Sequence, residues 1–461
     1  MTSGPPGGIP PRPPGRIALL GGKPTLARDA HRSWPIVTDD DKRAVMRVLD
    51  RGVLSGSAGP EAVAFQEELA ELAQAKHAVL THSGTSALVL ALAAAGVRAG
   101  DHVVVPAYSF VATALAVVQV GAIPIFVDVD EATGLMDPEA AARAVTPRTR
   151  AIMPVHVHGC PADVAALKRL AERHRVALVE DAAQAHGATY GGAPVGALGA
   201  SGAFSFQSSK NLPAGEGGVF LTNDRSLAEV ADRVRNFGQN APLHQAADFD
   251  ASRPLDGSRP LASERMGGMY RGNEMMAAFG RSQLGRLREA TARCQKNAER
   301  LSNALAELPG VAPPTVPEGR TSVHHKFRVR FSPEGAGVDL PARVLRDAMM
   351  KALRAEGLEV VLWQTDVLPA QPVFRAREGF GDGWPWSTDR ETDFAAIYDP
   401  ARFPRARALL DDSVVLFSQS CPLIAQTEET VDRYAEAVRR VWQARSDLAA
   451  WAAREGLTRT A

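Results

Sequence analysis

The residues with the clearest capacity for chemistry lie between positions 202 and 218, in the sequence GAFSFQSSKNLPAGEGG. A short aromatic strand predicted over residues 203–207 ends in a Ser-Ser-Lys turn, and a glycine-rich loop follows. Lys210 stands in that turn. A lysine amine forms a Schiff base with a carbonyl once burial or a nearby charge lowers its pKa. Taken alone, the pattern fits an ordinary surface lysine equally well, because a motif needs its structural context.

A carboxylate is the second candidate group. Asp181 follows the apolar run that ends at Val179, so it lies at the C-terminal end of a predicted strand, where ligands of open α/β sheets gather. A carboxylate in that place could hold the protonated ring nitrogen of a pyridine cofactor and make the ring a better electron sink. The alternative is an aspartate that caps the following turn.

A possible phosphate site precedes both groups in the chain. Residues 81–86 read Thr-His-Ser-Gly-Thr-Ser, between a predicted strand and an Ala/Leu-rich helix whose first N–H groups would be free to bind an anion. For this motif alone we favour the alternative that Ser83 or Thr85 caps the helix. No GxGxxG or GxxxxGK[ST] motif occurs here, which favours a cofactor smaller than a dinucleotide. A phosphate site, an acidic strand end and a loop lysine, in this order, are the parts that pyridoxal 5'-phosphate (PLP) requires.

The elements that position these groups alternate along the chain. Strands are predicted at 78–80, 102–105, 123–127, 151–155, 176–179, 203–206 and 219–221. Helices are predicted at 86–95, 110–120, 138–144 and 162–173. This alternation predicts an α/β fold with a mostly parallel sheet of about seven strands and helices on both faces.

The pattern changes after residue 321. A strand at 327–331, a helix at 341–356, a strand at 359–363, a Trp/Gly/Pro-rich insertion at 375–404 and a helix at 427–445 indicate a smaller C-terminal α+β domain. We therefore predict a disordered Pro/Gly-rich leader at 1–16, a large domain with an N-terminal arm at 17–275 and a small domain at 276–461.

Composition excludes several classes of partner. Lys+Arg and Asp+Glu both total 52 in 461 residues, so no attraction to nucleic acid or to a membrane surface is expected. The first residues lack the features of a signal peptide, and the apolar stretch 86–95 is too short to span a bilayer. The three widely spaced cysteines favour neither disulfides nor a structural metal site. We expect a cytoplasmic protein that acts on small molecules.

The chain resembles the DegT/StrS-type sugar aminotransferases, a PLP-dependent family with the aspartate-aminotransferase fold (fold type I). The resemblance extends over residues 17–441, and its opening at 19–24 is most similar to the branch that acts on keto-cyclitols and aminohydroxybenzoate precursors. The motifs that carry it are Ser83–Leu88, Pro106–Thr113, Pro154–His156, Glu180–Gly187 and Phe204–Gly218.

The resemblance implies a role for each matching residue. Lys210 would form the Schiff base and then shuttle the proton, while Asp181 would pair with the pyridinium nitrogen. The resemblance also implies that the cofactor's phosphate is held by Gly84, Thr85 and Ser205. The cofactor ring would lie against Phe110 and Gln184, and the substrate would contact Tyr108 and His325. The family builds its pocket between two subunits, which implies a homodimer. One position departs from the family, because Met269 stands where an asparagine commonly reaches the neighbouring subunit's phosphate.

Three functions follow as hypotheses. The leading one is transfer of an amino group from glutamate or glutamine, through pyridoxamine phosphate, to a keto-sugar (a sugar nucleotide) or a keto-cyclitol in secondary-metabolite biosynthesis. The second keeps PLP but makes the enzyme a dehydratase or an aromatising lyase, as in aminohydroxybenzoate synthesis. The third is a non-catalytic protein that uses the PLP fold to bind a ligand; the Asp181/Lys210 pair argues against it.

Overall fold

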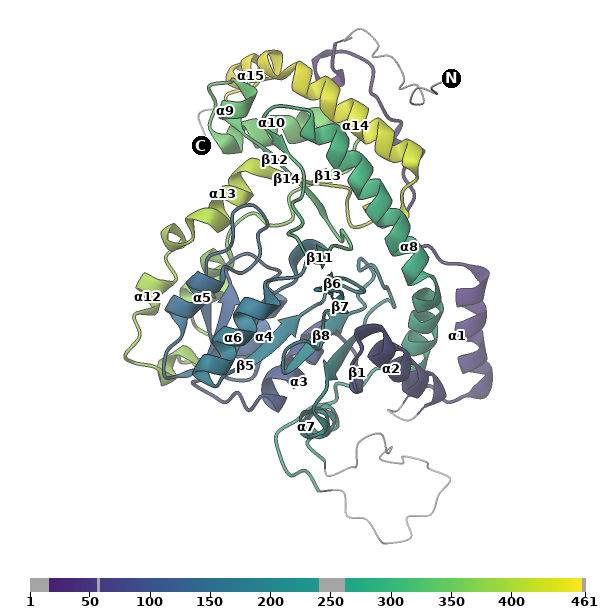
Figure 1. The fold of residues 1–461 in the computed structure, drawn as a ribbon, viewed down its shortest axis with the longest axis vertical. Helices are drawn as coiled ribbons and strands as arrows, with labels where there is room; N and C mark the ends of the chain where they lie inside the picture. Colours follow the sequence, from purple (N-terminus) through teal and green to yellow (C-terminus); the bar gives the residue numbers. More distant parts are fainter. Residues whose placement is uncertain (1–15, 56–58, 240–261, 458–461) are drawn as a thin grey trace, which may run out of the picture.

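The computed structural model describes residues 16–55, 59–239 and 262–457. Of the predicted leader, all but Arg16 lies outside these described residues. Figure 1 shows two parts stacked along the long axis of the molecule, with a large sheet in one part and a smaller sheet in the other.

The large sheet has seven strands in the order β1-β9-β8-β5-β4-β2-β3. Strand β9 alone runs opposite to the other six strands, so the predicted mostly parallel sheet of seven strands is confirmed. Every residue of β2, β3, β8 and β9 is buried, as expected of strands covered on both faces. The strands are β1 (His77–Thr81), β2 (His102–Pro106), β3 (Ile123–Val127), β4 (Thr149–Ile152), β5 (Ala177–Asp181), β8 (Ser201–Ser205) and β9 (Gly218–Thr222).

Helices pack on the two faces of this sheet. In Figure 1 they surround the strands, and helix α3 contacts α4 and α7, α5 contacts α6, and α2 contacts α8. Helix α3 is apolar around most of its circumference, because it is enclosed by the sheet and by other helices. The helices are α2 (Pro60–Ala73), α3 (Gly84–Ala94), α4 (Ala112–Gln119), α5 (Pro138–Ala144), α6 (Val164–His174), α7 (Arg225–Arg235) and α8 (Glu274–Ala306).

A smaller antiparallel sheet forms the C-terminal part, as the predicted α+β pattern requires. Its strand order is β10-β12-β14-β13. Helices α10 and α14 pack beside it, and α8 reaches from this part to the large sheet (Figure 1). The elements are β10 (Val311–Ala312), β12 (Phe327–Phe331), α10 (Ala342–Ala355), β13 (Val360–Val361), β14 (Ser413–Leu416), α14 (Glu428–Gln443) and α15 (Arg445–Arg454).

Segments from each side of the predicted boundary at residues 275 and 276 pack in the hydrophobic core of the other part of the molecule. Ile17 and Leu26, from the N-terminal arm, pack in the core of the C-terminal sheet. Phe374, Trp386 and Tyr398, from the C-terminal half of the sequence, pack in the core of the large sheet. The division of the chain between residues 275 and 276 stays a prediction.

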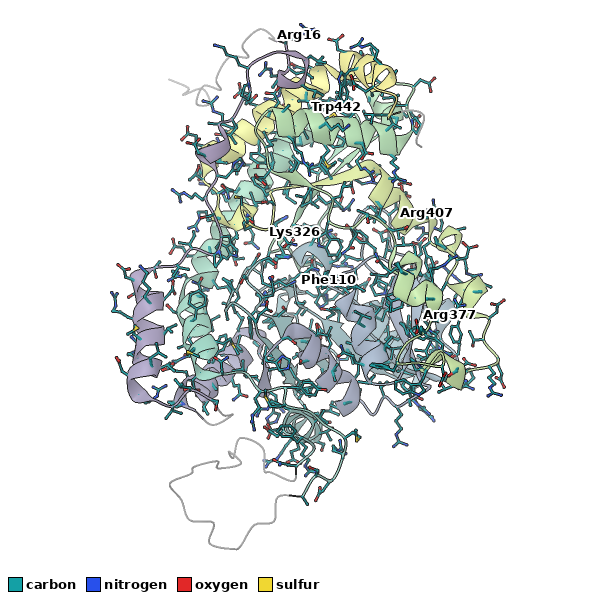
Figure 2. All side chains as sticks on the ribbon, turned by 180° about the vertical axis from the view of Figure 1, so that it is seen from behind. Arg16, Phe110, Lys326, Arg377, Arg407 and Trp442 are labelled. Atoms are coloured by element: carbon teal, nitrogen blue, oxygen red, sulfur yellow. The ribbon has the colours of Figure 1, made fainter. Side chains whose placement is uncertain are left out.

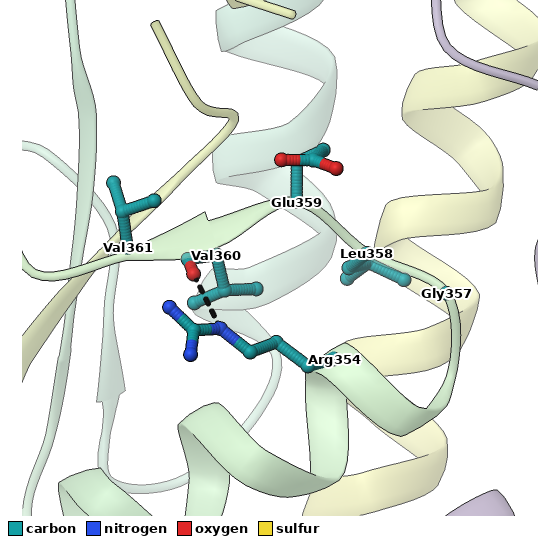
Figure 3. A pocket seen from close by; sticks show the side chains of 6 residues that line it. All are labelled: Arg354, Gly357, Leu358, Glu359, Val360 and Val361. Atoms are coloured by element: carbon teal, nitrogen blue, oxygen red, sulfur yellow. Dashed lines mark hydrogen bonds between the residues drawn. The ribbon is translucent and has the colours of Figure 1, made fainter. Parts of the chain in front are cut away.

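A recess lies beside β13, the edge strand of the small sheet. Arg354 lines it together with residues 357–361, and the Nε of Arg354 donates to the carbonyl of Val360 at 2.8 Å (Figure 3). The candidate catalytic groups lie elsewhere, at the carboxyl ends of the inner strands β5 and β8 of the large sheet. Among the helices that the structure describes, none combines the length and apolar character needed to cross a membrane.

Candidate active site

The acidic and amine candidates lie at the same edge of the large sheet. Strands β5 and β8 are parallel neighbours, with Asp181 opposite Ala203, so their carboxyl ends point the same way. Asp181 is the last residue of β5, and Lys210 follows β8 in a turn that closes with a hydrogen bond from its backbone N–H to Gln207 at 2.8 Å. Trp34, from the N-terminal arm, donates its indole N–H to the Lys210 carbonyl at 3.0 Å.

The electrostatics of this pair favour a reactive amine. Burial lowers the pKa of Lys210 to about 8, against the opposing effect of the Asp181 charge. A larger share of neutral amine is therefore present near neutral pH than for a solvated lysine. Burial raises the pKa of Asp181, against the stabilising effects of the Thr113 hydroxyl, which donates at 2.7 Å, and the Ala183 N–H at 3.2 Å.

The proposed phosphate residues come together at the start of α3. Ser83 is the N-cap and accepts from the backbone N–H of Ser86 at 3.1 Å, so the capping interpretation is correct for this residue. Gly84 and Thr85 begin the helix, where N–H groups have no partner within the helix. A Cβ on Gly84 would lie 2.5 Å from the Cβ of Ser205, so only glycine allows this approach of α3 to the end of β8.

His158 joins two of the predicted residues. Its backbone N–H donates to the Oε1 of Gln184 at 2.8 Å, and its ring Nε2 lies 2.8 Å from the hydroxyl of Tyr108. The His158 φ of 59° turns the chain at this point. Trp363 packs edge-on against both rings, with centroids 5.1 Å from Tyr108 and 4.7 Å from His158. These contacts connect Tyr108 and Gln184 through His158.

The other two predicted residues have contrasting environments. His325 is buried, its Nδ1 lies 3.3 Å from the Oδ1 of Asn211, and burial holds its pKa well below the usual value. Asn211 is the residue after Lys210, so this contact brings His325 beside the lysine turn. Phe110 is 54 % exposed and lies just before α4, an unusual exposure for an aromatic side chain. Figure 2 labels Phe110 and Lys326 near the middle of the molecule, between the large and the small sheet.

Sequence reasoning missed four side chains at this site. Thr113 fixes the carboxylate of Asp181. His158 orders Tyr108 and Gln184, and Lys326 and Arg328 are buried cations on the side of the small sheet. The alternation of charged and apolar residues in Lys-Phe-Arg-Val-Arg at 326–330 was a usable signal, because it places three cations, Lys326, Arg328 and Arg330, on one face of a strand.

Comparison with known proteins identifies the family. Residues 35–389 match the DegT/DnrJ/EryC1/StrS aminotransferase family. This chain belongs to that family. It is 41% identical over 327 residues to the L-glutamine:2-deoxy-scyllo-inosose aminotransferase of Streptomyces lividus, covering 69% of this chain and 74% of that protein. It is 40% identical over 288 residues to the dTDP-3-amino-3,4,6-trideoxy-alpha-D-glucose transaminase of Streptomyces venezuelae, covering 62% of this chain and 71% of that protein.

A solved structure agrees with the family assignment. 3-Amino-5-hydroxybenzoic acid (AHBA) synthase superposes with a TM-score of 0.75 and 31% sequence identity, over 90% of this chain and 99% of that chain. The predicted resemblance and the fold class are therefore confirmed, and the protein is an aminotransferase. Membership of the family implies PLP.

The residues present fit PLP. The Lys210 amine has a lowered pKa and Asp181 is a buried carboxylate whose two present donors leave it capacity to accept another. The close approach of Gly84 to Ser205 brings a helix N-terminus and a hydroxyl to one place, as a phosphate requires. Met269 is 51 % exposed and carries no polar group, so it cannot replace the family asparagine as a donor.

Proposed function

We propose that this aminotransferase moves an amino group from L-glutamine or L-glutamate to a keto-cyclitol or a keto-sugar in secondary-metabolite biosynthesis. The observation that carries the proposal is a buried carboxylate, Asp181, near an amine with a lowered pKa, Lys210. Both groups lie at the carboxyl ends of two neighbouring strands. Support for the substrate class comes from the relatives, one named for a scyllo-inosose and one for a dTDP-sugar.

Lys210 and Asp181 would act on the reacting carbon and on the cofactor ring, respectively. PLP, when bound, supplies the electron sink for the bond that breaks at the amino-bearing carbon. Lys210 would take a proton from the donor's carbon with its Nζ and return one to the acceptor's carbon. Asp181, fixed by Thr113, would hold positive charge on the cofactor ring. Burial would strengthen the ion pair between Asp181 and the cofactor ring, because the local dielectric is low.

The remaining residues would bind and orient. We assign Gly84, Thr85 and Ser205 to the phosphate of the cofactor. The ring of Phe110 and the amide of Gln184 would contact the cofactor ring, and Tyr108 and His325 would contact the substrate. Stacking on Phe110 would also explain why this aromatic side chain is left exposed.

Incorporation of labelled nitrogen tests the reaction. The PLP-loaded enzyme is given L-glutamine or L-glutamate labelled with ¹⁵N at the α-amino group, together with a panel of keto-cyclitols and dTDP-keto-sugars. We expect label in one class of product, detected by mass spectrometry, and formation of the matching keto acid. Water loss or a new aromatic absorbance without label in the product would contradict this proposal and favour the dehydratase or aromatising lyase, a reading that the AHBA synthase neighbour supports.

We further propose a homodimer that shares its active sites and works in the cytoplasm. The apolar side chains that support a dimer lie along the N-terminal arm and helix α1 (Asp39–Arg51), which Figure 1 shows packed outside α8. The exposed members are Ile36, Val37, Met46, Leu49, Val53 and Leu54. The cytoplasmic location is supported by the free thiols of all three cysteines.

Replacing Leu49 by aspartate tests the dimer. Leu49 is 46 % exposed, and burying such a side chain stabilises by about 1.5–3 kcal/mol. We expect the L49D dimer to dissociate at least tenfold more readily, measured by sedimentation velocity over a dilution series. Val373→Asp, at an apolar position in α11 (Pro372–Ala376) that is 40 % exposed, is the control. A monomeric wild type, or equal effects of both variants, would contradict the proposal.

A further inference from the structure

Two buried cations lie two positions apart in the sequence at the start of β12. Lys326 precedes the strand and Arg328 is its second residue, and their exposed fractions are 4 % and 5 %. Residues two apart on a strand point to the same face. Within the described residues, the Nζ of Lys326 and the Nη1 of Arg328 have no hydrogen-bond partner. Such groups are costly to bury unless a partner of opposite charge arrives.

The Arg328 side chain is anchored on one side only. Its Nη2 donates to the backbone carbonyl of Ala132 at 3.0 Å, which leaves Nη1 free to donate elsewhere. The guanidinium is therefore held in place while one of its donors is unused. A fixed, unused donor is what a binding group requires, because little side-chain entropy is then lost when the ligand binds.

Both cations line one small recess. The recess also contacts His158 and Cys160, and none of its lining residues, all within the described part of the chain, is acidic. Its free volume is about 20 Å³, which accommodates about one water-sized group. The recess thus has room for one small polar atom, such as an oxygen of a carboxylate, and not for a nucleotide.

The recess adjoins residues that we assign to the substrate and the cofactor ring. His158 contacts both Tyr108 and Gln184, and Lys326 donates its backbone N–H to the His158 carbonyl. The charge of Lys210 acts on Lys326, whose pKa is about 8 because of burial first and of Lys210 second. A group bound by Lys326 would therefore belong to a molecule that reaches Lys210.

We propose that Lys326 and Arg328 bind a carboxylate of the amino donor. This inference rests on the proposed function, in which the donor is glutamine or glutamate. A keto-cyclitol acceptor is uncharged, whereas the donor always brings an α-carboxylate. Its two oxygens match the two free donors, one on Lys326 and one on Arg328, and hydrogen bonds between charged groups are about twice as strong as neutral ones.

Separate half-reactions test the assignment. With Lys326→Met in the PLP-loaded enzyme, we expect the L-glutamine concentration at half-maximal rate to rise at least tenfold in the donor half-reaction, followed by the cofactor's absorbance. The half-saturating concentration of an uncharged keto-cyclitol in the acceptor half-reaction should change less than threefold. Arg328→Lys should raise the donor value less, since it retains the charge. Lys351→Met, which removes a lysine packed on Trp451 in the C-terminal part, is the matched control.

A binding measurement separates this inference from the proposed function. Glutarate, a dicarboxylate without an amino group, is titrated into the PLP-loaded wild type and variants by calorimetry, with dTDP as the second probe. We expect glutarate affinity to fall at least tenfold in K326M and to be unchanged in the control. Unchanged glutarate affinity in a folded K326M would overturn the assignment, and so would a selective loss of dTDP affinity. Lys326→Gln replaces K326M if thermal unfolding shows that methionine is not tolerated. An enzyme that transfers no amino group but binds glutarate in this way would refute only the proposed function.

Discussion

Lys210→Ala is expected to lower the rate of amino transfer by roughly 10²–10⁴-fold, because no other group would move the proton at the substrate carbon. The same variant should lose the visible absorbance of a lysine-bound cofactor while it still retains PLP through the residues around Gly84 and Ser205. Steady-state rates with L-glutamine and absorbance spectra of the dialysed protein measure the two effects.

Lys296→Ala is the control for this prediction. Lys296 is exposed and pairs with Glu428 at 2.8 Å, and such surface pairs contribute about 0–1 kcal/mol. A Lys210→Ala enzyme that retains its visible absorbance would contradict the assignment and point to Lys326, a buried lysine whose pKa is also lowered to about 8. The pH dependence gives a further check, since a pKa of about 8 means that cofactor capture by the cofactor-free wild type should accelerate as pH rises through 8.

Asp181→Asn should be the second most damaging change. The amide is nearly the same size but carries no charge, so the positive charge on the cofactor ring would lose its partner in a buried place. We expect kcat to fall about 10²-fold or more, the size of loss seen when one preorganised electrostatic group is removed from an active site. Steady-state kinetics and the cofactor spectrum as a function of pH measure the effect.

A second buried carboxylate provides the comparison for Asp181. Asp389 is equally buried and pairs with His102 at 2.9 Å, away from the catalytic residues. Asp389→Asn should lower the free energy of unfolding and leave kcat nearly unchanged. If both variants lost only stability, Asp181 would have a structural role and the cofactor assignment would be wrong. Thr113→Val should give a smaller loss of kcat than D181N, because it removes only the group that orients the carboxylate.

Local patterns in the sequence predicted most of the strands and helices of the large sheet. β3 and α5 begin and end where the apolar run and the helical pattern predict. β4 stops at Ile152, short of the predicted residue 155, because Pro154 has no N–H to donate to a neighbouring strand. Strand β14 was not predicted, although it is the inner strand of the small sheet between β12 and β13. Its four buried residues begin directly after the last residue of α13 (Pro404–Asp412), so no loop separates the strand from the helix.

What the sequence determined by itself is the order of groups along the sheet edge. A phosphate motif, Asp181 and Lys210 each follow a predicted strand, and parallel strands bring their carboxyl ends to one edge. That order was sufficient to predict PLP chemistry, and the motifs that contain these groups were sufficient to predict the family.

Only the tertiary structure decided how these groups are charged, fixed and surrounded. The lowered pKa of Lys210, the Tyr108–His158 contact and the donors of Lys326 and Arg328 that lack a partner among the described residues all depend on residues distant in sequence. The physical reason is that burial and electrostatic interaction depend on distance in space, whereas strand and helix patterns depend on neighbours along the chain. A sequence pattern therefore locates a candidate catalytic lysine, but the fold determines its pKa and the residues that surround it.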